Sequence, residues 1–215
     1  IDLTAKFESN MREKLSLATA LAVDEDSATA ARSRATISID PLRDMGQSWT
    51  ASTYSLGQHF CADGNQSHEI GRFAKKIDDI DFDGLDLAVR RFLSSVVHRH
   101  DLVDSLIDAV VGLENLFGHR SEISFSVASG VAMLLGSSSE ERNDIFEGVK
   151  DVYNARSAFV HGDKKRMNKI DLSDKRKKAV CYLKRSLRKI VVDRPELISL
   201  SASDRAKLLI LSDKH

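Results

Sequence analysis

The chain is poor in the residues that interrupt helices: only 2 prolines and 11 glycines occur among its 215 residues. Proline removes a backbone donor, and glycine weakens a helix interior by about 1 kcal/mol, so their scarcity favours long helices. No apolar run approaches the roughly 18 residues that a membrane-spanning helix needs, and we therefore expect no membrane partner. The sequence begins at Ile1 with nothing resembling a signal peptide, which predicts a piece of a longer protein.

Cysteines and nucleotide-binding motifs are also scarce. The two cysteines, Cys61 and Cys181, show no pairing pattern, so we expect free thiols and a cytoplasmic protein. The chain has no glycine-rich phosphate loop, no serine-nucleophile elbow and no dinucleotide fingerprint. These absences disfavour P-loop nucleotide hydrolases, serine hydrolases and dinucleotide-dependent oxidoreductases, and no cofactor is expected.

Charge is balanced overall but unevenly distributed. Residues 1–161 hold 16 Lys and Arg against 25 Asp and Glu, whereas residues 162–215 hold 16 against 7. Thirteen of these later cations lie between Lys164 and Arg194. Such a basic block is typical of a site for a polyanion, although a solvated helix face that balances an acidic surface would have the same composition.

Apolar residues recur at helical spacing along most of the chain. The predicted helices cover about 4–22, 67–77, 84–96, 101–117, 121–135, 140–161, 173–192 and 202–211. Asp83 is predicted to cap the third, Ser138 and Glu141 have the spacing of a capping box, and the almost wholly apolar 121–135 helix is expected in the middle of the bundle. Strand-like alternation over 35–39, and a weaker signal over 49–54, predict one or two short strands.

The predicted fold class is therefore all-α. We expect an antiparallel helical bundle over residues 67–215, with its core at about 84–192. Residues 1–66 are interpreted as an irregular N-terminal extension that includes a short strand or two, or as the remnant of an upstream domain.

Arg156 and His161, separated by four residues, form the most informative pair of polar residues. Arginine binds phosphate through a planar fork of donors, and histidine titrates near neutral pH. Arg156 continues the apolar stripe of its helix, while His161 stands at the helix end, before Gly162, which is placed for a left-handed cap. The pair is suited to phosphodiester cleavage, but a packing arginine and a capping histidine would give the same pattern.

Several other polar residues carry weaker signals. Glu114 lies beside the apolar stripe of its helix and could pair with Arg156 or orient His161. Asp101, Asp104 and Asp108 form another stripe, for which a solvated face is favoured over metal ligation. Histidine and cysteine also occur close together at His59, Cys61 and His68, but no second pair completes a zinc site.

Three segments together resemble the Apea-like branch of the HEPN superfamily (higher eukaryotes and prokaryotes nucleotide-binding). They are the run from Asp104 to Phe117 that contains Leu-Glu-x-Leu-Phe, the apolar helix ending in Ala132-Met-Leu-Leu135-Gly136, and the run from Val152 to Gly162 that contains Arg-Ser-x-x-Val-His-Gly. The resemblance covers about residues 84–192.

The resemblance implies a helical homodimer that brings two Arg-x4-His motifs into one cleft. In active members it implies metal-independent RNA cleavage in toxin–antitoxin, abortive-infection and other antiviral systems, with an antitoxin or an upstream sensor domain as a further partner. Arg156 would hold the scissile phosphate, His161 would be the general acid and base, and Glu114 would support them. The predicted RNA contacts are Asn154, Ser157, Lys164, Lys165 and Arg166.

Ser157 occupies a position where active members commonly have Asn, Asp or His. A second prediction therefore stays open, in which the chain is a non-catalytic HEPN dimerisation or nucleotide-binding module of a larger assembly.

Overall fold

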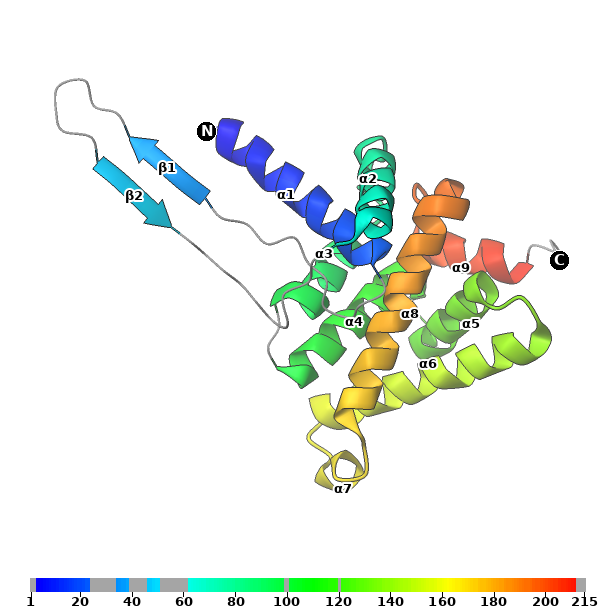
Figure 1. The fold of residues 1–215 in the computed structure, drawn as a ribbon. Coiled ribbons are helices and arrows are strands. Elements are labelled where there is room, and N and C mark those ends of the chain that lie inside the picture. Colours follow the sequence, from blue (N-terminus) through cyan, green and yellow to red (C-terminus); the bar gives the residue numbers. More distant parts are fainter. Residues whose placement is uncertain are drawn as a thin grey trace.

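The computed structural model describes residues 3–23, 34–38, 46–50, 62–98, 101–119 and 121–211. Most of these residues are helical, which confirms the predicted all-α bundle (Figure 1). The helices are α1 (Leu3–Ala22), α2 (Gly64–Asp78), α3 (Asp86–Leu93), α4 (Leu102–Phe117), α5 (Ile123–Leu135), α6 (Ser139–Val160), α7 (Lys164–Met167), α8 (Leu172–Asp193) and α9 (Ala202–Leu211). A π-helical turn, η1 (Ser94–His98), extends α3, and a 3₁₀ turn, η2 (Pro195–Leu197), follows α8.

Helix α4 is the centre of the bundle, because it packs against α3, α5, α6, α8 and α9. Leu106, Leu113 and Phe117 on this helix are fully buried. At Gly112 an added Cβ would lie 2.5 Å from the Leu183 side chain, so the missing side chain lets α8 approach closely. Helix α5, predicted to lie in the middle, is buried mainly from Val127 onward.

Helix α1 shares its core with the helices that follow it. It packs against α2, α3 and α8, and its residues Leu17 and Leu21 belong to the same buried cluster as Phe73 and Ile77 of α2. The boundary predicted at residue 66 therefore does not separate two hydrophobic cores.

Two strands form a hairpin between α1 and α2. Strands β1 (Arg34–Ser38) and β2 (Gly46–Thr50) pair antiparallel, with Arg34 opposite Thr50 and Ser38 opposite Gly46. Strand β1 corresponds to the strand predicted over 35–39. Only the first two residues of the strand predicted over 49–54 fall within β2, and the rest lie outside the described residues.

The ends of α4 and α6 follow from short polar sequences. Asp101 caps α4 by accepting hydrogen bonds from the backbone N–H groups of Val103 and Asp104. Ser138 caps α6 by accepting one from Glu141 at 3.1 Å. The Glu141 carboxylate accepts from Ser137 and not from Ser138, so the predicted capping box is only half formed.

Asp83 does not cap α3 as predicted. The N-cap position is Leu85, and the backbone N–H of Asp83 donates to the Asp81 carboxylate at 3.1 Å instead. The preceding turn is fixed by a distant element, because an added Cβ at Gly84 would meet the Ile198 carbonyl oxygen at 2.1 Å. A contact between residues so far apart in sequence overrides the local capping signal.

Arg205 on α9 is a buried cation held by backbone carbonyl groups. Its side chain is 1% exposed, and burial lowers its pKa to about 10, still far above neutral pH. The guanidinium donates to carbonyl oxygens at the C-terminal end of α4, in η2 and in the turn before α3; these belong to Asn115, Leu116, Leu197 and Gly84. A cation at this place complements the partial negative charge at the end of α4.

Candidate functional site

The C-terminal half of α6 and the facing side of α4 meet through a tyrosine and a glutamate. The Tyr153 hydroxyl donates a hydrogen bond to Glu114 Oε1 over 2.7 Å. The sequence predicted that Glu114 would pair with Arg156 or orient His161. Its described hydrogen-bond partner is Tyr153 instead.

Tyr153 is half-buried, and its environment favours the protonated hydroxyl. Burial raises the pKa of Tyr153 above its ordinary value of 10.0, and the hydrogen bond and negative charge of Glu114 raise it further. The positive charge of Arg156 acts in the opposite direction. The hydroxyl therefore remains a donor to Glu114 at neutral pH, and the guanidinium lies close enough to affect it.

Arg156 is half-buried, and its Nε atom is fully buried. Among the described residues, this nitrogen has no hydrogen-bond partner. Buried nitrogens of this kind usually have a partner, and the guanidinium fork matches a phosphate or a carboxylate. Arg156 therefore has an unused donor next to the Tyr153–Glu114 pair, and because this nitrogen is closed off from solvent, a ligand would meet other atoms of the guanidinium first.

His161 stands at the end of α6 and is exposed. The helix closes with two crossed hydrogen bonds, from the N–H of Asp163 to the Ala158 carbonyl at 3.0 Å and from the N–H of Gly162 to the Phe159 carbonyl at 3.3 Å. Gly162 has φ of +67°, which confirms the predicted left-handed cap. The imidazole is thus accessible to solvent at the C-terminal end of the helix.

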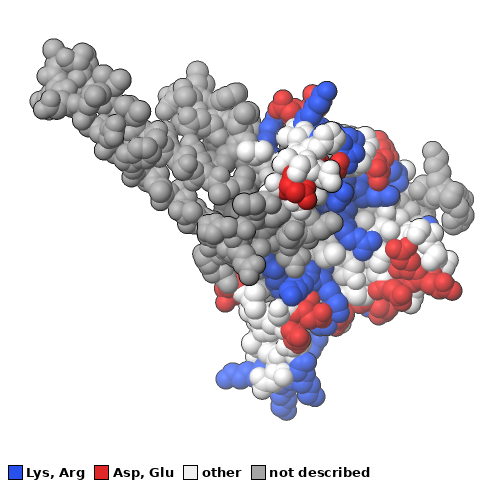
Figure 2. All heavy atoms as spheres, viewed as in Figure 1, with Lys and Arg blue, Asp and Glu red and all other residues white. Residues whose placement is uncertain are grey.

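The basic residues after His161 form the short helix α7. Lys164, Lys165 and Arg166 are exposed, and Figure 2 shows Lys and Arg atoms gathered at the bottom of the molecule, where Figure 1 places α7. Arg166 Nη2 also donates to the backbone carbonyl of Asn154 over 3.4 Å, which ties α7 to α6. Asn154 itself is exposed, so this edge of α6 and the three cations of α7 face solvent together.

Within one chain, the predicted catalytic residues fall into two groups. Glu114 and Arg156 are brought together around Tyr153. His161 is five residues beyond Arg156, or about 140° around an α-helix. In the part of the chain that the structure describes, no hydrogen bond or ion pair joins its ring to Arg156 or Glu114. Ser157, also predicted to bind RNA, is half-buried, and its carbonyl accepts from the His161 N–H.

The predicted solvated stripe of aspartates on α4 is wrong at one position. Asp101 and Asp104 are exposed, but Asp108 is 2% exposed and accepts hydrogen bonds from Arg91 and Ser94, each at 2.7 Å. Asp108 faces α3 and η1, which supply these donors from Arg91 and Ser94. The described residues contain no group of three or more His, Cys, Asp or Glu side chains arranged for a metal, while His59 and Cys61 lie outside them.

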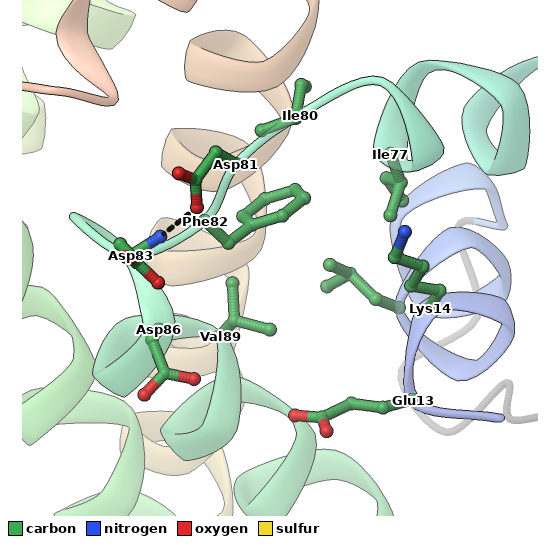
Figure 3. A pocket seen from close by; sticks show the side chains of 10 residues that line it. Glu13, Lys14, Ile77, Ile80, Asp81, Phe82, Asp83, Asp86 and Val89 are labelled. Carbon is green, nitrogen blue, oxygen red and sulfur yellow. Dashed lines mark hydrogen bonds between the residues drawn. The ribbon is translucent and has the colours of Figure 1, made fainter. Parts of the chain in front are cut away.

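An acidic pocket of about 460 Å³ lies between α1, α2 and α3. Figure 3 shows Phe82 and Val89 on one side, facing Lys14 and Glu13 of α1 on the other. Three aspartates, Asp81, Asp83 and Asp86, also line it, while Lys14 is engaged by Asp78 at 2.7 Å. The excess of carboxylates disfavours phosphate, so this pocket is not part of a nucleic-acid surface.

Tyr153 was not among the site residues predicted from the sequence. A signal was present, because a tyrosine on a buried stripe usually finds a hydrogen-bond partner for its hydroxyl. Glu114, the polar residue beside the apolar stripe of a facing helix, was the available acceptor.

None of the described helices is both long and apolar enough to cross a lipid bilayer. No protein-family model, curated protein or solved structure matches the chain.

Proposed function

We propose that the chain is a metal-independent endoribonuclease-like domain of the HEPN type. It cleaves RNA by attack of the RNA's own 2′-hydroxyl and is the effector part of a prokaryotic antiviral or toxin system in the cytoplasm. The observation that carries the proposal is the place of Arg156, a half-buried arginine one turn along α6 from Tyr153, which is the hydrogen-bond partner of Glu114. The resemblance of the Arg156–His161 segment to HEPN motifs supplies the reaction.

Each residue has a role that fits its surroundings. Arg156 binds the scissile phosphate and stabilises the charge that develops on it. His161, exposed at the end of α6, takes the proton from the 2′-hydroxyl and returns one to the leaving oxygen. Tyr153 holds Glu114 by a hydrogen bond beside Arg156, and the cations of α7 attract the RNA backbone.

Because Arg156 and His161 point about 140° apart on one helix, the proposal includes a homodimer. In a dimer, the histidine of one chain and the arginine of the other can approach the same phosphodiester.

The test is to incubate purified wild-type protein with total RNA in the presence of EDTA. We expect cleavage that leaves a cyclic phosphate, and a loss of about 100-fold or more in His161→Ala and in Arg156→Ala. Lys207→Ala, an exposed cation on α9, is the matched control and should cleave normally. Equal cleavage by wild type and His161→Ala, or none by either, would rule the activity out.

The second candidate is a non-catalytic dimerisation or nucleotide-binding module. It is favoured by Ser157 after the motif arginine and by the separation of Arg156 and His161, which stand about 140° apart around α6 within one chain. A growth assay separates the two, because an active ribonuclease should be toxic when overexpressed and its His161→Ala variant should not. A dimer whose cellular function survives both Arg156→Ala and His161→Ala would support the module.

A further inference from the structure

We infer that a second phosphate-binding site for the RNA backbone lies between α2 and the C-terminal half of α8, remote from Arg156 and His161. This inference rests on the proposed function for the identity of the ligand. The site is a pocket of about 380 Å³ lined by four cations and one carboxylate. The cations are Arg72, Arg185, Arg188 and Lys189, the carboxylate is Asp193, and the remaining lining residues are Leu135 and Val192.

Two of the guanidinium groups are positioned by the same buried ring. The Arg72 guanidinium lies 5.6 Å from the centroid of the Phe73 ring, and that of Arg188 lies 5.4 Å from it. The two cations are therefore no more than about 11 Å apart, and stacking on a ring that is 1% exposed restricts their motion. Cations ordered before binding lose less conformational entropy when they engage a phosphate.

Three carboxylates near the pocket offset part of its positive charge. Glu69 pairs with Arg72 at 2.7 Å, and Asp193 pairs with Lys189 at 3.1 Å. Among the described residues, no carboxylate forms an ion pair with Arg185, which is exposed. Glu141 also acts electrostatically on Arg185. The lining itself holds four cations against one carboxylate, Asp193, in contrast to the acidic pocket beside α1.

Cations also gather at helix C-termini because they complement the backbone carbonyl groups there. This structural role would account for only some of the four cations that line the pocket. It fits Arg188 and Lys189, which are within about one turn of the end of α8. Arg185 lies two turns before that end, and Arg72 comes from α2. The terminal carbonyl of Val192 already accepts a hydrogen bond from Lys76 at 3.3 Å.

Cations connect this pocket to α7 along one helix. Lys177, Lys178, Arg185 and Lys189 are exposed on α8, and Figure 2 shows Lys and Arg atoms over α8 as well as over α7. From Leu172 to Arg188 the helix rises about 24 Å. A stacked strand at about 3.4 Å per nucleotide covers that distance with about seven nucleotides. An RNA of this length or more can occupy both ends of α8.

The experiment measures binding, so that it does not depend on cleavage. In a His161→Ala background, fluorescence anisotropy would follow labelled RNAs of roughly four and roughly 15 nucleotides at about 50 and about 200 mM salt. The test variant is Arg185→Ala with Lys189→Ala, and the control is Lys207→Ala with Lys75→Ala, two exposed cations outside the pocket. The same variants on the wild-type background would be assayed for cleavage.

We expect the test variant to bind the long RNA more weakly than the control does, with little change for the short RNA. Loss of two phosphate contacts lowers the slope of log affinity against log salt concentration by about 1.4. Raising the salt from about 50 to about 200 mM should therefore weaken RNA binding by the test variant about sevenfold less than it weakens binding by the control. Equal binding by test and control variants would overturn the pocket even if wild type cleaves RNA. If the test variant binds RNA more weakly than the control but wild type cleaves no RNA, the pocket would be supported and the ribonuclease rejected. Anionic phospholipid vesicles that bind with the same dependence, while RNA does not, would reject RNA as the ligand.

Discussion

At the scale of single residues, the candidate site depends on a hydrogen bond between two half-buried groups. Tyr153 donates to Glu114, and burial together with that hydrogen bond raises the pKa of Tyr153. Tyr153→Phe would leave the Glu114 carboxylate without its described donor at little change in volume. We expect the free energy of unfolding to fall by about 1–2 kcal/mol.

The pH dependence of this loss follows from the direction of the shift. A tyrosine whose folded pKa is raised contributes stability that is fully present below its unfolded pKa, near 10.0, and is lost only as pH rises through the folded pKa. The difference between wild type and Tyr153→Phe should therefore stay constant from about pH 6 to about pH 9 in urea unfolding experiments. Tyr182→Phe is the matched control, since no hydrogen bond of its hydroxyl is described, and it should be nearly neutral. A Tyr153 variant as stable as this control would contradict the role assigned to the bond.

At the scale of elements, α9 is held to the bundle by Arg205, which bridges the end of α4, η2 and the turn before α3. Arg205→Ala would leave several buried carbonyl groups without a donor and open a cavity. We expect a loss of about 3 kcal/mol or more in the free energy of unfolding, measured with urea. Lys207→Ala, two residues further on the same helix but exposed, should change it by less than about 0.5 kcal/mol. Similar losses in the two variants would show that the guanidinium does not hold these elements.

At this scale, features that depend on neighbouring residues could be predicted from the sequence, and features that depend on distant elements could not. Helix positions followed from apolar spacing, and the caps at Ser138 and Gly162 followed from local chemistry, because both depend on neighbours within a turn. The capping by Asp83 failed because the Ile198 carbonyl, remote in sequence, fixes that turn. Asp108 was misplaced for a similar reason, since its donors lie on another helix.

The candidate site was predictable to a similar extent. The residue types at Arg156 and His161 pointed to phosphate chemistry, and Glu114 was recognised as a polar residue beside an apolar stripe. Its pairing with Tyr153 was not predicted, because a spacing within one helix does not say which residues of two helices face each other. The pocket residue Arg72 lies outside the basic block, and only the packing of α2 on α8 brings it there.

At the scale of the whole molecule, the proposed activity needs two chains. If His161 of one chain and Arg156 of another act on one phosphodiester, an excess of a chain carrying both Arg156→Ala and His161→Ala should suppress wild-type cleavage. The suppression should appear once subunits have exchanged, and sedimentation should show a dimer. The control is an equal excess of the double mutant of Lys75 and Lys207, which should not suppress cleavage. Unchanged activity with the inactive chain in excess would mean that each chain cleaves alone.

The exposed thiol of Cys181 offers a practical way to follow the binding of RNA along α8. It lies on α8 one turn from Lys178 and from Arg185, midway between α7 and the basic pocket. A fluorophore attached there, in a Cys61→Ser background so that a single sulfur reacts, would sit beside the route inferred for the RNA strand. Quenching of that dye on mixing would time the arrival of a strand along α8 separately from any bond breaking.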